Sequence, residues 1–209
     1  MIIQKILFDL DGTLFDTQKI HSEVEAKILR ENGVEITATE ITQRYSGYKT
    51  QSFFSELLGN QDLAKELANE KWKIVNNYVN EAVPLTDLCS LFLSLIDKKV
   101  KFAIGTTSLK SWAVGLLENH NLIKFFSDND IIGGDLVTYG KPNPEIWFRA
   151  AGAIKSENCL VVEDGLVGAQ GALSAKIPCA FICEKLPQGD EYKDLIKISN
   201  VKDILSLLK

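Results

Sequence analysis

The 209-residue sequence has few of the residues that build disulfide frameworks or zinc sites. It contains four cysteines, none of them in a C-x-x-C pair, and only two histidines, neither of which lies near a cysteine in the sequence. Cys179 and Cys183 lie in the apolar stretch IPCAFIC, as small buried hydrophobic residues do. These shortages argue against a disulfide-stabilised secreted scaffold and a zinc site, and they favour a reducing compartment.

The sequence also lacks an excess of basic residues. Lysine and arginine number 23 against 28 acidic residues, so the formal net charge is −5 and the sequence pI is about 5.2. A protein that binds nucleic acid needs a basic face to meet the phosphate backbone. We therefore expect no nucleic-acid partner, whereas a small anionic substrate, which needs only a local positive site, is compatible with this charge.

Long hydrophobic runs, repeats and low-complexity tracts are missing as well. No window is long and apolar enough to span a bilayer, and the apolar start MIIQKILF is too short for a signal peptide. We expect no membrane partner and a cytoplasmic location. For the assembly we expect a monomer or a weak homodimer.

What the sequence does contain is an alternation of short apolar runs and helix-like segments. The β-like runs cover 2–8, 100–105, 130–133, 159–162 and 179–183, and most are almost wholly apolar, as strands covered on both faces are. From the second run on, helices are predicted over 111–119, 144–153, 167–175 and near 201–208. This order predicts an α/β fold, with a Rossmann-like parallel sheet and helices on both of its faces.

Residues 17–83 break the alternation because they contain no convincing strand. Apolar residues recur at helical spacing over 20–28, and Gly33 ends that helix. TATE at 37–40 is a capping box for a second helix, Thr50 is the expected cap of a third that ends at Gly59, and a fourth covers about 62–80. We predict a small all-helical cap domain over 17–83 inserted into a core of 1–16 and 84–209, where a helix over 86–97 leads to the second strand.

Polar residues gather where the predicted strands end. Ligands bind outside the carboxyl ends of the strands in an open parallel sheet. Several carboxylates there need a cation to remain ionised together, and hard oxygen ligands suit Mg²⁺, which is usually shared with a phosphate. A lysine and a hydroxyl add what phosphoryl transfer needs. The residues at these ends are Asp9, Asp11, Thr106, Thr107, Ser108, Lys141, Glu163 and Asp164.

Asp9 and Asp11 have a spacing suited to two roles. In extended backbone, residues i and i+2 point the same way, about 6.6–7 Å apart. One carboxylate can attack phosphorus and form an aspartyl-phosphate, and the other can protonate the leaving oxygen and later deprotonate water. Gly12 lets the chain turn directly after the pair.

Four motifs carry a family resemblance. DLDGTLFDT, IGTTS, GKPNPEIW and VVEDGLVGAQGA resemble, in this order, the four motifs of the haloacid dehalogenase superfamily, and the helical insertion resembles the cap of its phosphatase and β-phosphoglucomutase branch. The resemblance implies Asp9 as nucleophile and Asp11 as general acid and base. It implies that Thr106, with Thr107 as a close rival, and Lys141 hold the phosphoryl group. The Mg²⁺ ligands it implies are Asp9, the backbone carbonyl of Asp11, Asp164 and Glu163.

Other residues allow two interpretations. His21 is either a half-exposed helix residue or a substrate-binding group in the cleft between cap and core, and Lys49 is either a solvated charge or a contact to a distal substrate group. The glycines of GLVGAQGA have the spacing G-x-x-G-x-x-G, which differs from the dinucleotide-binding pattern, so we assign them to helix packing. Tryptophans are predicted in cores: Trp72, Trp112 and Trp147.

The predicted function is a Mg²⁺-dependent phosphatase that acts on a small phosphorylated metabolite. A sugar phosphomutase like β-phosphoglucomutase is the alternative, because Thr17 and His21 have the spacing of that enzyme. Against it, only Lys49 stands where that enzyme uses an arginine for the far phosphate. A non-catalytic binding or regulatory protein on this scaffold is a third hypothesis, which the presence of Asp11 opposes, as it opposes a dehalogenase.

Overall fold

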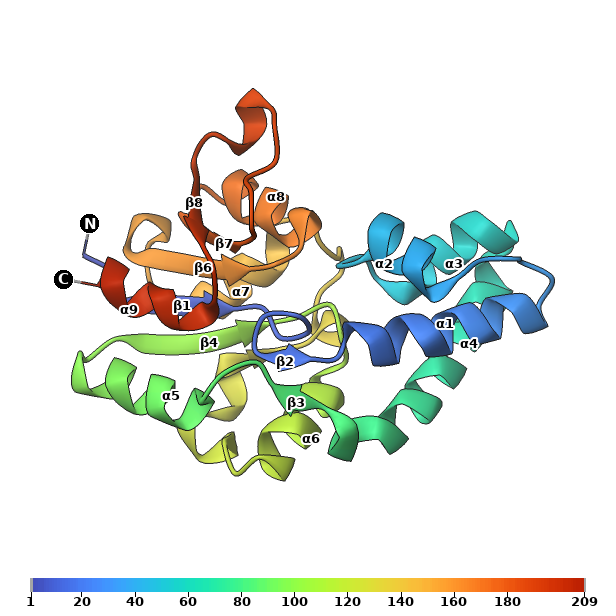
Figure 1. The fold of residues 1–209 in the computed structure, drawn as a ribbon, viewed down its shortest axis with the longest axis horizontal. Coiled ribbons are helices and arrows are strands. Elements are labelled where there is room, and N and C mark those ends of the chain that lie inside the picture. The colour runs from blue at the N-terminus through green and yellow to red at the C-terminus, as the bar shows by residue number, and fades with distance from the viewer. Residues whose placement is uncertain (1, 209) are drawn as a thin grey trace.

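The computed structural model describes residues 2–208 and contains a six-stranded parallel sheet in the order β5-β4-β1-β6-β7-β8 (Figure 1). The strands are β1 (Lys5–Phe8), β4 (Lys101–Gly105), β5 (Ile131–Ile132), β6 (Cys159–Glu163), β7 (Cys179–Ile182) and β8 (Leu195–Ile198). β1 lies between β4 and β6 and pairs with both. The predicted α/β class with a parallel sheet is confirmed.

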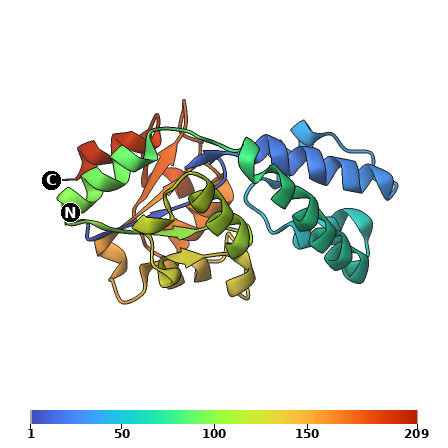
Figure 2. The same cartoon turned by 90° about the horizontal axis from the view of Figure 1, so that it is seen from below.

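Both faces of the sheet are covered by helices. Ile6 and Phe8 point into a core formed with α5 (Leu88–Asp97), α6 (Lys110–Asn119) and α9 (Ile204–Leu207). Leu7 points to the other side, where the core is formed with α7 (Glu145–Ala151) and α8 (Leu166–Ser174). Figure 2 shows α5 and α9 together on one side of the sheet. Because side chains alternate along a strand, the apolar sequence ILF supplies both cores.

Four helices form a separate group beyond the sheet edge: α1 (Gln18–Glu31), α2 (Ala38–Tyr45), α3 (Thr50–Leu58) and α4 (Gln61–Val75) (Figures 1 and 2). A short 3₁₀ helix (Asn76–Glu81) follows, so the segment predicted as one helix over 62–80 has two parts. The chain enters and leaves this group through a two-residue antiparallel pair, β2 (Phe15–Asp16) and β3 (Val83–Pro84). The domain limits at 17 and 83 stay a prediction.

Local sequence signals set several helix ends. The capping box is present, with the Thr37 side chain accepting from the Glu40 N–H and the Glu40 side chain accepting from the Thr37 N–H. Gly59 adopts the left-handed conformation that ends α3. The prediction that Thr50 caps α3 is wrong: Thr50 is the first helical residue and its hydroxyl donates to Glu25 instead, at 2.9 Å.

One strand of the six-stranded sheet was not predicted. β8 has the sequence LIKI, with Lys197 exposed, and it forms the edge of the sheet beside β7. A short edge strand buries only one face, so its sequence lacks the continuous apolar run of the central strands. Within residues 2–208 we find no helix with the length and apolar character required to cross a membrane.

Candidate active site

The carboxyl ends of β1, β4 and β6 open toward the helical group, and the arrowheads of these strands point to it in Figure 1. A cavity lies between this edge and helices α1–α4, with about 80 Å³ of space for the centres of water-sized groups. Its core wall includes Asp9, Asp11, Thr107, Ser108, Glu163 and Asp164. Its cap wall includes Gln18, His21, Glu25, Tyr45, Thr50, Lys71 and Trp72. Most of these lining side chains are polar or charged, which suits a polar ligand.

Asp9 and Lys141 form a buried ion pair at the end of β1. The Lys141 ammonium donates to Asp9 Oδ1 at 2.5 Å and to Glu163 Oε1 at 2.6 Å, and Lys141 is 3% exposed. Burial acts to lower the pKa of Lys141, but the charges of Asp9 and Glu163 outweigh it and raise the pKa. Lys141 therefore carries a fixed positive charge beside Asp9.

Asp9, Glu163 and Asp164 have carboxylate oxygens within 4.8 Å of one another. Burial, followed by the charge of Glu163, raises the pKa of Asp9 well above its usual range and that of Asp164 to about 7. One lysine does not balance three carboxylates. The excess negative charge and the oxygen ligands fit a divalent cation such as Mg²⁺.

Two further contacts show how the acidic site is shaped. The side-chain amide of Gln18 donates to Asp164 Oδ2 at 2.6 Å and to the backbone carbonyl of Asp11 at 3.5 Å, so these two oxygens face the same point. Gly12 has φ +93°, and a Cβ there would lie 2.3 Å from Asp164 Oδ2. Glycine is therefore required both by the turn and by the approach of Asp164.

Asp11 is held by hydrogen bonds to both of its carboxylate oxygens. Oδ1 accepts from Thr17 at 2.6 Å and from the Trp112 indole at 3.0 Å, and it lies 3.1 Å from Nε2 of His21. Oδ2 accepts from Ser108 at 2.5 Å. Burial acts to raise the pKa of Asp11, but the charge and hydrogen bond of His21, with the hydroxyls of Ser108 and Thr17, hold it well below its usual range.

Thr106 and Thr107 are placed differently. Thr106 is 1% exposed, its hydroxyl accepts from the Ser108 N–H at 3.1 Å, and it lies 3.4 Å from Asp11 Oδ2. Thr107 is among the residues that line the cavity. Thr106 thus contacts Asp11, whereas Thr107 shares the cavity with both aspartates.

His21 and Lys49, the two predicted substrate contacts from the helical group, have different positions. His21 lines the cavity and is 9% exposed, with its ring edge-to-face against Trp72 and Trp112. Lys49 is not among the lining residues, and its ammonium donates to the Val137 carbonyl at 2.9 Å. The structure therefore brings His21, and not Lys49, to the aspartates.

Several site residues were not predicted. Ser108 was counted among the polar residues at the strand ends without a role of its own, and Trp112 was predicted in a core, yet both donate to Asp11. Ser108 is the last residue of the IGTTS motif and Trp112 follows it four positions later, which was a signal for both. Glu25 and Lys71, which line the cap wall, resemble ordinary helix charges in the sequence and carried no such signal.

Comparison with known proteins gives concordant matches. The model of the haloacid dehalogenase-like hydrolase family matches residues 6–182. The 6-phosphogluconate phosphatase of Escherichia coli (strain K12) is 26% identical over 187 residues, covering 87% of this chain and 83% of that protein. The 2-deoxyglucose-6-phosphate phosphatase 2 of Saccharomyces cerevisiae is 30% identical over 229 residues, covering 94% and 90%.

Among solved structures, β-phosphoglucomutase from Clostridium difficile superimposes with a TM-score of 0.82 at 20% identity, covering 97% of this chain and 93% of that one. At this level of identity the likeness concerns the fold.

Proposed function

The chain belongs to the haloacid dehalogenase-like hydrolase family and is a phosphoric monoester hydrolase, and on this premise we propose that it hydrolyses a small organic phosphate, with Mg²⁺ bound, through an aspartyl-phosphate on Asp9. One observation supports this most directly. Asp9, ion-paired to Lys141, and Asp11, held by hydrogen bonds, lie on the wall of one cavity. The names of the relatives support a phosphorylated sugar or similar metabolite as the substrate class.

Asp9 is the proposed nucleophile. A carboxylate oxygen of Asp9 attacks phosphorus, the bond from phosphorus to the leaving oxygen breaks, and Asp11 gives its proton to that oxygen. The charge of Lys141 favours the ionised form of Asp9 against the effect of burial, and it offers positive charge to the phosphoryl oxygens. Water then attacks the aspartyl-phosphate while Asp11 takes its proton, which releases phosphate and restores Asp9.

Asp11 must be protonated for the first half of this reaction, although its surroundings favour the ionised form. A bound phosphate group places negative charge above Asp9 and so favours the neutral form of Asp11. We expect Asp11 to take up a proton together with the substrate. The base form is then available for the second half, when water must lose a proton.

The proposed direct ligands of Mg²⁺ are Asp9, Asp164 and the backbone carbonyl of Asp11. Both carboxylate oxygens of Glu163 already accept hydrogen bonds, from Lys141 at 2.6 Å and from the Gly165 N–H at 2.8 Å. Glu163 therefore suits a supporting charge that orients Lys141. The cation neutralises charge on the carboxylates and the phosphoryl oxygens when it is bound.

Thr106 and Thr107 are the proposed contacts to the phosphoryl group, and His21 is proposed to position Asp11. A phosphomutase is the second candidate function, because Thr17 and His21, which have the spacing of that enzyme, both contact Asp11. No arginine lines the cavity among residues 2–208, which leaves the mutase without a clamp for a far phosphate.

A screen of phosphorylated metabolites with Mg²⁺ tests the proposal. We expect release of inorganic phosphate, and loss of that release when EDTA removes the cation. Assaying glucose 6-phosphate formation from β-glucose 1-phosphate in the same samples separates a mutase from a phosphatase. Full activity in EDTA would contradict the role of Mg²⁺, and isomerised product without phosphate release would favour the mutase.

A further inference from the structure

A buried polar cluster of three residues lies in the cap wall of the cavity, where the proposed reaction makes no use of it. Glu25 on α1, Thr50 on α3 and Lys71 on α4 are 6%, 8% and 2% exposed. The Lys71 ammonium lies 3.3 Å from Glu25 Oε1 and donates to the Thr50 hydroxyl at 3.3 Å, and that hydroxyl donates to Glu25 Oε1 at 2.9 Å. All three residues line the cavity that holds Asp9 and Asp11.

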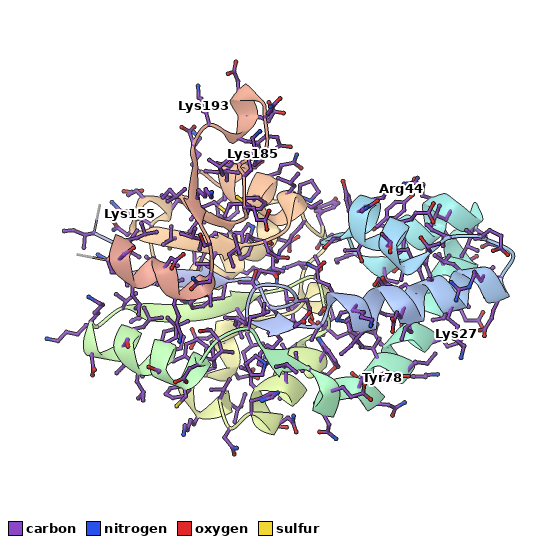
Figure 3. The ribbon with its side chains drawn as sticks, in the orientation of Figure 1. Lys27, Arg44, Tyr78, Lys155, Lys185 and Lys193 are labelled. Carbon is purple, nitrogen blue, oxygen red and sulfur yellow. The ribbon has the colours of Figure 1, made fainter. Side chains whose placement is uncertain are left out.

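Lys71 is the only lysine or arginine among the residues that line this cavity within 2–208. Its charge is already engaged, by Glu25, by Thr50 and by the Trp72 ring, whose centroid lies 3.7 Å from the ammonium nitrogen. Figure 3 shows two other cations of the helical group, Lys27 and Arg44, on its outer side, where both are exposed. The cap wall therefore offers no unpaired positive charge to a second anionic group of a substrate.

Glu25 keeps one free acceptor. Only its Oε1 receives hydrogen bonds from the described residues. Among residues 2–208, Nδ1 of His21 is the only fully buried side-chain nitrogen or oxygen that has no hydrogen-bond partner. Oε2 of Glu25 also has no partner, so it is not fully buried, and because Glu25 lines the cavity, this oxygen is accessible there. A carboxylate oxygen in a partly enclosed cavity accepts strongly from hydroxyl groups and repels anions.

We propose that Glu25 is a specificity-determining residue that accepts hydrogen bonds from substrate hydroxyls and, by neutralising Lys71, disfavours substrates with a second phosphate or a carboxylate at that end. The substrate class is then a polyol or sugar monophosphate whose far end is neutral. This inference rests on the proposed phosphatase function. It also separates this chain from a mutase, whose bisphosphate intermediate carries a second anion into the cap.

The test uses pairs of substrates that differ by one anionic group: glucose 6-phosphate against 6-phosphogluconate, and fructose 6-phosphate against fructose 1,6-bisphosphate. The variant Glu25→Gln keeps the shape of the side chain and leaves Lys71 with an unpaired charge. Glu23→Gln is the matched control, since Glu23 lies on the same helix but its side chain is 59% exposed. p-Nitrophenyl phosphate, which has neither hydroxyls nor a second anion, reports on the chemistry alone.

We expect the wild type to prefer the neutral member of each pair. In Glu25→Gln, the ratio of kcat/KM for the anionic member to that for the neutral member should rise about 10- to 100-fold, mainly through KM, as expected when a charged hydrogen bond is lost and a repulsion removed. Turnover of p-nitrophenyl phosphate should persist. In the double variant Glu25→Gln/Lys71→Gln, which no longer holds a cation, the ratio should fall back toward the wild-type value.

Two outcomes would overturn the inference: a wild-type preference for the anionic members, or an anionic-to-neutral ratio of kcat/KM that changes no more in Glu25→Gln than in Glu23→Gln. In either case, turnover of p-nitrophenyl phosphate would leave the phosphatase proposal intact. If Glu25→Gln does not fold, the double variant decides alone through the absolute value of kcat/KM. A fall in kcat/KM for the neutral members, which lose their hydrogen bonds to Glu25, supports the role of Glu25, and an unchanged kcat/KM for these members overturns it. Absence of all turnover in the wild type, p-nitrophenyl phosphate included, would instead overturn the phosphatase function itself, and the inference with it.

Discussion

The two walls of the cavity differ in their balance of negative and positive charge. The core wall gathers the carboxylates of Asp9, Asp11, Glu163 and Asp164, and the ammonium of Lys141 pairs with two of them, Asp9 and Glu163. The cap wall pairs one carboxylate, Glu25, with one ammonium, Lys71. An excess of negative charge suits a site that binds a cation together with a phosphoryl group, whereas a neutral ion pair suits recognition of an uncharged group.

The two walls also differ in how they are built. The core-wall groups follow the ends of neighbouring parallel strands, so the sheet fixes their spacing. The cap-wall groups come from three helices, α1, α3 and α4, which meet only through their packing. We therefore expect substitutions in the core wall to change the rate of the chemistry and substitutions in the cap wall to change which substrate is used.

Asp9→Asn is the substitution with the largest expected effect. An amide cannot attack phosphorus, so turnover should fall by about 10⁴-fold or more, as when other enzymes lose their nucleophile. Phosphate release at saturating substrate measures the effect, and circular dichroism should show an intact fold. Asp62→Asn, at an exposed position in the first turn of α4, is the control and should retain full activity. Near-wild-type phosphate release from Asp9→Asn would show that Asp9 is not the nucleophile.

Asp11→Asn should have the next largest effect. Loss of a general acid and base costs about 10²–10⁴-fold in rate. The loss in forming the aspartyl-phosphate should be larger for a sugar phosphate than for p-nitrophenyl phosphate, because a p-nitrophenolate leaves without a proton. Pre-steady-state measurement of the first step with both substrates checks this. Equal losses for the two leaving groups would mean that Asp11 does not protonate the leaving oxygen.

These two aspartates also show why the core wall could be predicted from the sequence. The apolar run before Asp9 predicted a buried strand, and the period of two along a strand predicted that Asp9 and Asp11 would face the same space. The order of the strands then brought Lys141 and Asp164 to the same edge. Each of these steps depends on local pattern and on the general rule for parallel sheets.

The cap wall could not be predicted in this way. Glu25 and Lys71 are single charges on amphipathic helices, and such charges are normally solvated. Only the packing of α1 against α4, which depends on contacts distant in sequence, turns both inward. The same limit applies to Trp112: its burial was predicted correctly, but its hydrogen bond to Asp11 depends on the position of α6 relative to β1.

Thr106→Ala and Thr107→Ala sharpen the description of the core wall. If Thr106 holds the phosphoryl group and Asp11 together, Thr106→Ala should lower kcat/KM about tenfold, the cost of one hydrogen bond to a charged group, and Thr107→Ala should lower it less. Steady-state kinetics on both variants measures the order. The reverse order would give the phosphoryl contact to Thr107, which lines the cavity.

Thr37→Ala should have the smallest effect, because it weakens the helical group without touching either wall. The hydroxyl of Thr37 caps α2, and its loss should lower the melting temperature by about 2–4 °C. The Thr37 hydroxyl also donates to Glu40 Oε2 at 2.7 Å, and this hydrogen bond, together with one from the Thr37 N–H, lowers the pKa of Glu40. A lowered carboxylate pKa stabilises the fold above the ordinary pKa and ceases to do so as the pH falls through the lowered value.

The difference in melting temperature between the wild type and Thr37→Ala should therefore be present at neutral pH and shrink in acid. Thr37 does not line the cavity, so kcat/KM well below the melting temperature should match the wild type for both members of each substrate pair. A selective loss for one member would mean that the start of α2 adjusts the cap wall. A substitution that lowers the stability of the helical group would then also change which substrate is used. In that case only the core wall would have a role, the chemistry, that can be changed without changing the stability of the helical group.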